Sequence, residues 1–274
     1  MIQSDAVPGR ALASGRNRRG PSLYAALAVA LAVVPAPAAA QGSVGELPDA
    51  SAIVARYVDA IGGREAVLRA ANSRTVGRFE IPAAGIVGQL EILAASGKSL
   101  SRITVDGLGT ISNGYDGEVG WSLDPMMGAR LLEGMELQAM RDQAHPAAAV
   151  RDASLFSSME TVERTEMGGV SCYKVKFVWK SGRENYDCFA EDTGHLVATT
   201  VRQESPMGAI EVTTLFSDYK RFGEILMPTR AVQQMLGQQQ VLIVESVEYD
   251  VVDDAAFELP PEIRAILSAG GGSE

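Results

Sequence analysis

The sequence has few of the residues that usually build catalytic or metal sites. Its 274 residues include two histidines and two cysteines. His145 and His195 are far apart in the chain, and neither has a companion at metal-ligand spacing. No nucleophile elbow, phosphate-binding loop or dinucleotide-binding fingerprint occurs. We therefore predict that the chain is not an enzyme and that it uses no metal and no cofactor.

One acidic cluster is a further candidate for chemistry. Asp250, Asp253 and Asp254 follow a predicted strand, but they lack the ligand alternation of a calcium-binding loop. We interpret them as solvated loop residues. A calcium or acid–base site is the alternative for this cluster, and an enzyme with an unrecognised site is a minor alternative for the whole chain.

Long apolar runs are also scarce, and the clearest lies near the N-terminus, from Leu23 to Val34. This run is short for a bilayer span, follows a leader with four arginines and precedes the small residues 38–40. That layout is typical of a cleavable secretory signal, so we predict that residues 1–40 are removed and that Gln41 starts the mature protein. An uncleaved membrane anchor is the alternative, and two prolines that follow the run argue against it.

The composition of the mature part excludes some partners. No cysteine stands directly after the cleavage region, which argues against a lipid anchor and favours a protein free in the periplasm. Removing four arginines and one aspartate with the signal takes the formal charge from −10 to −13, which argues against nucleic acid and anionic membrane surfaces. We expect a monomer with one domain over residues 41–269 and a disordered tail over residues 270–274.

The mature chain begins with a helical pattern. Asp49 or Ser51 can cap a helix that carries Ile53, Tyr57 and Ile61 on one face. Two glycines end this helix, and a short second helix follows over residues 66–70. The two helices form a hairpin that needs a sheet to pack on.

Strand patterns follow at once and dominate the rest of the chain. Residues 74–81 alternate so that Thr75, Gly77, Phe79 and Ile81 share an inward face. Glycines then separate several short strands, which is typical of an antiparallel meander. A helical period returns over residues 133–144 and ends before Pro146. Further strands are predicted at 172–180, 184–190, 196–203, 209–219, 229–236 and 240–251, and a short helix ends at Leu267.

The two cysteines lie on the two strands of one predicted hairpin. Cys172 and Cys188 flank a turn at residues 181–182, about two positions out of register. An oxidising compartment permits a disulfide, which we predict. A catalytic thiol is the weaker alternative, because no second cysteine at redox spacing and no nearby histidine supports it.

Methionines cluster in the middle of the chain. Met126, Met127, Met135 and Met140 occur close together, near Trp121. Because methionine is flexible and polarisable, such a surface can repack around ligands of different shape. The alternative is ordinary core beneath a helix, which spacing alone favours.

Three blocks resemble the periplasmic outer-membrane lipoprotein-sorting proteins, the LolA/LolB-like superfamily. The first is the Tyr-Asp-Gly…Trp…Pro block over residues 114–125, and the second is the tyrosine, glycine and proline hairpin over residues 219–230. The third is the ending Phe-Glu-Leu-Pro at residues 257–260. The order of predicted elements is similar over nearly the whole mature chain. None of the three blocks contains an arginine that can be assigned the role of holding a helical lid closed.

The resemblance implies an incomplete antiparallel β-barrel whose helical lid covers an apolar cavity. It also implies a soluble periplasmic carrier or chaperone that binds lipid or lipoprotein acyl chains. A sensory module that binds lipid and a periplasmic or membrane protein partner on the same fold is the alternative. We predict that the ligand contacts Phe79, Ile81, Leu90, Ile92, Trp121, Met126, Met127, Met135, Met140, Val175, Phe177 and Trp179.

Overall fold

The structure is a computed structural model, and it describes residues 46–95, 97–205, 208–235 and 238–270. The predicted signal peptide, residues 1–40, lies outside the described residues. Gly270 ends the last helix, and the rest of the predicted tail, 271–274, also lies outside them.

The described chain starts with two short helices. Helix α1 (Ala50–Ala60) begins after Asp49, whose carboxylate accepts a hydrogen bond from the Ser51 amide at 2.8 Å. Gly62 and Gly63 have positive φ angles and turn the chain into α2 (Arg64–Arg69). The predicted helical hairpin is therefore present.

Thirteen strands follow in one antiparallel sheet. Their order is β6-β5-β4-β3-β2-β1-β13-β12-β11-β10-β9-β8-β7. Their bounds are β1 Ser73–Ile81, β2 Ile86–Ala95, β3 Lys98–Val105, β4 Gly109–Tyr115, β5 Gly120–Asp124, β6 Gly128–Leu131, β7 Phe156–Met167, β8 Val170–Trp179, β9 Glu184–Ala190, β10 Leu196–Ser205, β11 Gly208–Phe222, β12 Ile225–Met235 and β13 Gln238–Tyr249.

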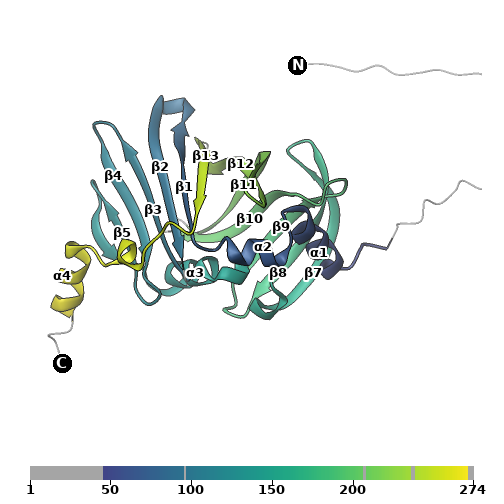
Figure 1. The fold of residues 1–274 in the computed structure, drawn as a ribbon, viewed down its shortest axis with the longest axis horizontal. Coiled ribbons are helices and arrows are strands. Elements are labelled where there is room, and N and C mark those ends of the chain that lie inside the picture. The colour runs from purple at the N-terminus through teal and green to yellow at the C-terminus, as the bar shows by residue number, and fades with distance from the viewer. Residues whose placement is uncertain (1–45, 96, 206–207, 236–237, 271–274) are drawn as a thin grey trace, which may run out of the picture. The chain divides into compact units, whose positions relative to one another are not determined.

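The sheet is curved but does not close, because β6 and β7 lie at opposite ends of the strand order (Figure 1). Its first strand lies in the middle, where β1 pairs with β2 on one side and β13 on the other. The predicted fold class, an incomplete antiparallel barrel with helices, is confirmed.

The remaining α-helices lie in one insertion and in the C-terminal segment. Helix α3 (Gly134–Ala144) lies between β6 and β7 in the chain, and α4 (Pro261–Gly270) follows β13. In Figure 1, α1, α2 and α3 lie along the same side of the sheet, whereas α4 stands at the end near β5. Among the described residues, no helix combines the length and apolarity that a membrane span requires.

Three apolar clusters hold the domain together. The largest joins α1 to the β7–β10 end of the sheet and contains Phe156, Phe177, Trp179 and Phe189. The second joins Trp121 and its neighbours to the C-terminal segment through Phe257 and Ile263. The third is small and surrounds the two cysteines.

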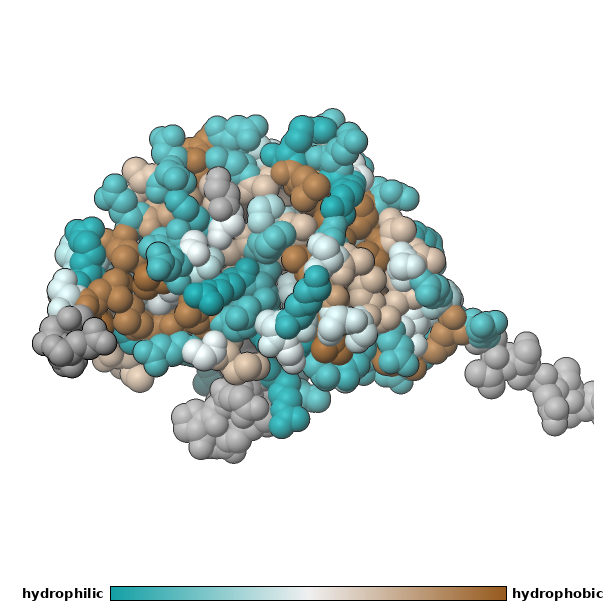
Figure 2. All heavy atoms as spheres, turned by 90° about the horizontal axis from the view of Figure 1, so that it is seen from below, coloured by the Kyte–Doolittle hydropathy of each residue, from teal (hydrophilic) through white to brown (hydrophobic). Residues whose placement is uncertain are grey.

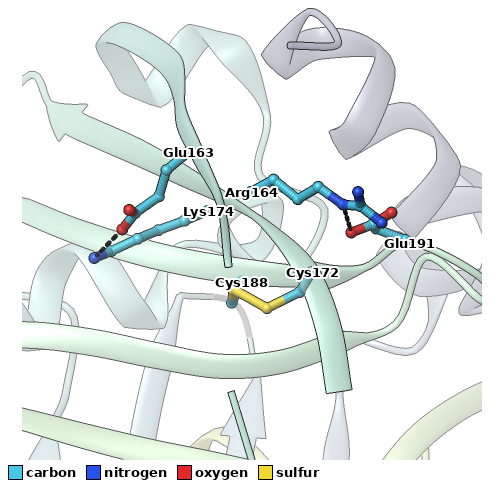
Figure 3. The surroundings of a disulfide bond; sticks show 6 residues. All are labelled: Glu163, Arg164, Cys172, Lys174, Cys188 and Glu191. Atoms are coloured by element: carbon cyan, nitrogen blue, oxygen red, sulfur yellow. Dashed lines mark hydrogen bonds and ion pairs between the residues drawn. A yellow bond between two sulfur atoms is a disulfide. The ribbon is translucent and has the colours of Figure 1, made fainter. Parts of the chain in front are cut away.

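Cys172 and Cys188 form a disulfide between β8 and β9 (Figure 3). In the strand register, Cys172 faces Ala190 and Cys188 faces Lys174, so the bond joins positions offset by two residues. The Cα atoms are 5.6 Å apart, within the range that a disulfide spans. Both cysteines are buried, which keeps this bond inside the third cluster.

Candidate functional site

A cavity of about 630 Å³ lies between the helices and the middle of the sheet. Its volume falls in the range of small-molecule sites. Most of the surface that lines it is apolar. The described residues that line it are Tyr57, Ile61, Val67, Ala70, Ala71, Ser73, Thr75, Ile92, Ala94, Ala95, Gly97, Lys98, Ser99, Leu100, Ser101, Asn113, Met140, Gln143, Ala144, His145, Pro146, Ala149, Arg151, Leu196, Tyr219, Ile225, Leu226, Met227, Pro228, Val247 and Tyr249.

The cavity exists because small side chains face inward on neighbouring strands. In the register of β1, β2 and β3, Ser73 pairs with Ala94, and Ala94 pairs with Ser99. The next inward row places Thr75 opposite Ile92, which lies opposite Ser101. Because most of these side chains are short, they leave space beneath the helices that larger side chains would fill.

Helix α3 forms one wall of the cavity and buries little of itself. None of its residues is buried, although Met140 and Ala144 line the cavity. Its attachments are mainly polar. The Arg130 guanidinium donates two hydrogen bonds to Glu136 at 2.7 and 3.0 Å. Near the other end, Arg183 donates to Asp142 at 2.8 Å. Both side chains of the Arg183–Asp142 pair are only 11% exposed, so this shielded pair fixes the C-terminal end of α3 against the β8–β9 turn.

The segment after α3 is tied to the sheet by a buried ion pair. Arg151 has a positive φ of 50° and lines the cavity. Its Nε donates to an Asp187 carboxylate oxygen at 2.8 Å. The Asp187 side chain is fully buried and also accepts hydrogen bonds from Asn185 and Thr199. A fully buried carboxylate needs such partners, because an unpaired charge is costly in a protein interior.

The same groups have shifted pKa values. Burial lowers the pKa of Arg151, but the Asp187 carboxylate, together with the Tyr57 and Tyr219 hydroxyls, outweighs burial and the pKa is raised. Burial raises the pKa of the Tyr57 and Tyr219 hydroxyls, which lie near Arg151. The guanidinium also lies over the Tyr57 ring, 5.6 Å from its centroid. On this side of the cavity, Arg151 therefore stays charged, whereas the Tyr57 and Tyr219 hydroxyls stay protonated and neutral.

A smaller cavity of about 240 Å³ shares Gln143, Ala149 and Arg151 with the main one. Its lining includes Arg183 and Asp187, so it is more polar than the main cavity. The main cavity therefore suits an apolar guest, whereas the smaller one suits water or a polar group.

Two of the twelve predicted contact residues, Ile92 and Met140, lie in the lining of the main cavity. Three others, Val175, Phe177 and Trp179, lie in the aromatic cluster at the β7–β10 end. Phe177 contacts Phe156 and Phe189 with ring centroids 4.8 and 6.4 Å apart. Val175 and Phe177 are fully buried in this cluster, whereas Trp179 also lines the smaller cavity.

The other seven predicted residues are also outside the lining. Trp121 belongs to the second cluster, and Leu90 is buried. Phe79 and Ile81 are half-buried on β1. The remaining three lie at the surface, and their exposed fractions are 88% for Met126, 86% for Met127 and 55% for Met135.

Most of the cavity wall was not predicted from the sequence. Its members include small or polar residues such as Ser73, Ala94 and Ser101, which hydrophobic alternation does not select. The available signal was a run of short side chains at the inward positions of neighbouring strands. Arg151 carries no sequence signal, because its partner Asp187 lies on a distant strand.

Comparison with known proteins identifies the fold. No protein-family model matches the sequence, and no curated protein matches it either. Among solved structures, a LolA superfamily protein from Nitrosomonas europaea is similar, with a TM-score of 0.53 and 14% identity over 78% of this chain and 99% of that one. A DUF1329 family protein from Desulfovibrio piger is similar with a TM-score of 0.51 and 13% identity over 77% and 98% of the two chains.

These similarities cover nearly the full length of both solved chains. At such low identity they establish the fold and not the activity. The chain therefore has a LolA/LolB-like fold, as the three sequence blocks indicated. In the helix-side view of Figure 2, apolar surface patches lie among hydrophilic side chains.

Proposed function

We propose that the chain is a soluble periplasmic carrier or chaperone that binds a lipid-modified protein or another lipid-like ligand in the main cavity. The observation that carries this proposal is the mostly apolar cavity of about 630 Å³ beneath a polar-tethered helix. An apolar guest that enters such a cavity loses contact with water, which supplies the main free energy of binding.

The proposal retains the cellular setting that the sequence predicts. Residues 1–40 are the export signal, and residues 41–269 form one monomeric domain in the periplasm. Ile92 and Met140 are the ligand contacts that we keep from the predicted set, because both line the cavity. The Met140 side chain reaches the cavity from α3, so this helix acts as the lid.

A matched pair of substitutions on α3 tests the proposal. Met140→Asp puts a carboxylate into the cavity wall, whereas Met135→Asp makes the same change at an exposed position of the same helix. Burying an ionised carboxylate against an apolar chain is strongly unfavourable. We expect the delipidated protein to increase the fluorescence of an acyl-chain dye, Met140→Asp to weaken dye binding at least tenfold, and Met135→Asp to leave it unchanged.

Native mass spectrometry of protein purified from its own periplasm provides a second measurement. Copurified lipid supports the carrier. The proposal fails if the native and delipidated proteins bind no dye, or if both substitutions weaken binding equally.

A further inference from the structure

The wall of the main cavity offers no free charge to a ligand. Among the described residues that line it, none is aspartate or glutamate, and Arg151 is already held by the fully buried Asp187. Lys98 belongs to the lining, but it lies opposite Ala95 on the other face of the sheet, where its ammonium pairs with Asp254 at 2.9 Å. An ionised ligand group would therefore lose water in this cavity without gaining an opposite charge.

Uncharged polar side chains do face the cavity, on both sides of β2. Ser73 and Thr75 lie on β1, and the strand register continues their two inward rows across β2 to Ser99 and Ser101 on β3. Asn113 lies opposite Ser101 on β4, and all five residues line the cavity. Because neighbouring strands are about 4.8 Å apart, the β1 group and the β3 group are separated by about 10 Å. The cavity floor therefore carries two neutral polar groups with an apolar strip between them.

Several of these side chains have no hydrogen-bond partner within the described part of the chain. The Thr75 hydroxyl is one of them, although Thr75 is only 8% exposed, and the Tyr57 hydroxyl above the floor is another, at the same exposure. In the same part of the chain, no completely buried side-chain oxygen or nitrogen lacks a partner. Both hydroxyls therefore reach the open space of the cavity, where only water or a ligand can pair with them.

A ligand that fills the cavity removes water from these hydroxyls. A pure hydrocarbon would leave each covered hydroxyl without a partner, which is unfavourable in a protein interior. An ester carbonyl brings no charge and accepts up to two hydrogen bonds, so it can replace the lost water. Aliphatic chains attached to the ester can lie against the apolar walls that α2 and the start of β12 provide through Val67, Ile225 and Leu226.

We propose that the ligand is an uncharged lipid ester, and that the hydroxyls of Thr75 and Ser101 donate hydrogen bonds to its carbonyl oxygens. This inference rests on the proposed function and narrows the ligand class. A lipid with two or more ester groups can engage the β1 group and the β3 group together. The same ester chemistry occurs in a free acylglycerol and in the acyl groups of a lipid-modified protein.

A series with one fixed chain length tests this inference on the unmodified mature protein. Methyl dodecanoate, dodecyl methyl ether, dodecanoate and dodecyltrimethylammonium compete with a neutral acyl-chain dye, each below its solubility limit and micelle concentration. The measurement is made at about pH 8, where a free carboxyl group is ionised. Hydrogen bonding to the carbonyl predicts that the ester binds about five- to tenfold more tightly than the ether. Both ions should bind more weakly than the ester.

Substitutions then assign the preference to the two hydroxyls. Thr75→Val keeps the shape of the side chain and should reduce the preference for the ester, and adding Ser101→Ala should abolish it. Binding of the ether should not weaken in either variant, which a merely structural role does not predict. Thr75→Ser keeps a hydroxyl and should retain the preference. Thr104→Val makes the same change at an exposed position of β3 outside the lining and is the matched control.

The outcomes separate this inference from the proposed function. If no compound of the series displaces the dye, the carrier function fails. If the ether binds as tightly as the ester, or dodecanoate binds more tightly, the carrier stands and the ester inference is overturned. An ester preference that survives in the Thr75→Val, Ser101→Ala double variant overturns the assignment to these hydroxyls. Dioctanoylglycerol, free and attached to a short uncharged peptide, should also displace the dye, and the tighter form identifies the source as a free lipid or a lipid-modified protein.

Discussion

The two parts of the sheet's inner face show how side-chain size decides between a core and a cavity. At the β7–β10 end, Phe156, Phe177, Trp179 and Phe189 meet under α1 and fill the space. In the middle, serine, threonine and alanine occupy much of the corresponding inner face, and a cavity remains. The strands of both parts belong to the same continuous antiparallel sheet. The backbone therefore provides the curvature, whereas local side-chain volume determines where a ligand can enter.

A chain of hydrogen bonds connects the aromatic β7–β10 end of the sheet to the cavity in the middle. The Trp179 indole donates to Asn185 at 2.6 Å, and Asn185 donates to Asp187 at 2.8 Å. Asp187 in turn accepts from Arg151, which lines the cavity. The aromatic end thus holds in place the cation at the edge of the cavity. We expect substitutions at the aromatic end to change stability and substitutions in the middle to change binding.

The largest expected effect is at the aromatic end. Phe177→Ala removes a fully buried ring and should lower the free energy of unfolding by about 4 kcal/mol. Urea denaturation followed by tryptophan fluorescence measures this change. The folded fraction of the variant should still bind the acyl-chain dye with unchanged affinity. A large loss of dye affinity in fully folded protein would show that the two parts are not separate.

A smaller free-energy change is expected when a large side chain fills the main cavity in the middle of the sheet. Ala94→Phe places a ring in the cavity and should weaken dye binding at least tenfold, about 1.4 kcal/mol, because the ring occupies the space of the ligand. Its free energy of unfolding should change little, since the space is already present. Val87→Phe on the same strand is the control, because Val87 is 57% exposed. Equal binding by both variants would contradict the location of the site.

The smallest effect concerns a surface tie between α2 and the segment before β7. Asp152 pairs with Arg64 and caps the backbone at Ser154. Hydrogen bonds from Ser154, with those from Arg64, lower the pKa of Asp152 to about 2. A lowered pKa stabilises the folded state above the unfolded pKa, and this stability is lost as the pH falls from about 4 to about 2.

The expected loss is about 1 kcal/mol, because solvent screens a pair in which Arg64 is half exposed. Thermal unfolding of the wild type and of Asp152→Asn across this pH range measures it. The difference in stability between the two proteins should shrink as the pH falls. A difference that is constant with pH would exclude this carboxylate as the titrating group.

The sequence predicted the elements well and the cavity wall poorly, for a physical reason. Alternation at residues 172–180 and capping at Asp49 are local signals, and β8 and α1 lie where these signals place them. Which inward residue faces a cavity depends on the side chains across the sheet and on the helices above it. Phe177 was predicted to contact ligand because it is large and inward, yet its size is the reason that no space remains beside it.

The strand order also bears on when the cavity is completed during folding. Because β1 pairs with β13, the first and last strands of the meander meet in the middle of the sheet. The cavity spans this seam, with Ser73 and Thr75 on one side and Val247 and Tyr249 on the other. A chain that has not yet folded as far as β13 lacks the second side. The cavity is therefore complete only when the C-terminal strand has folded back onto the first one, so loss of β13 alone would open one whole side of it.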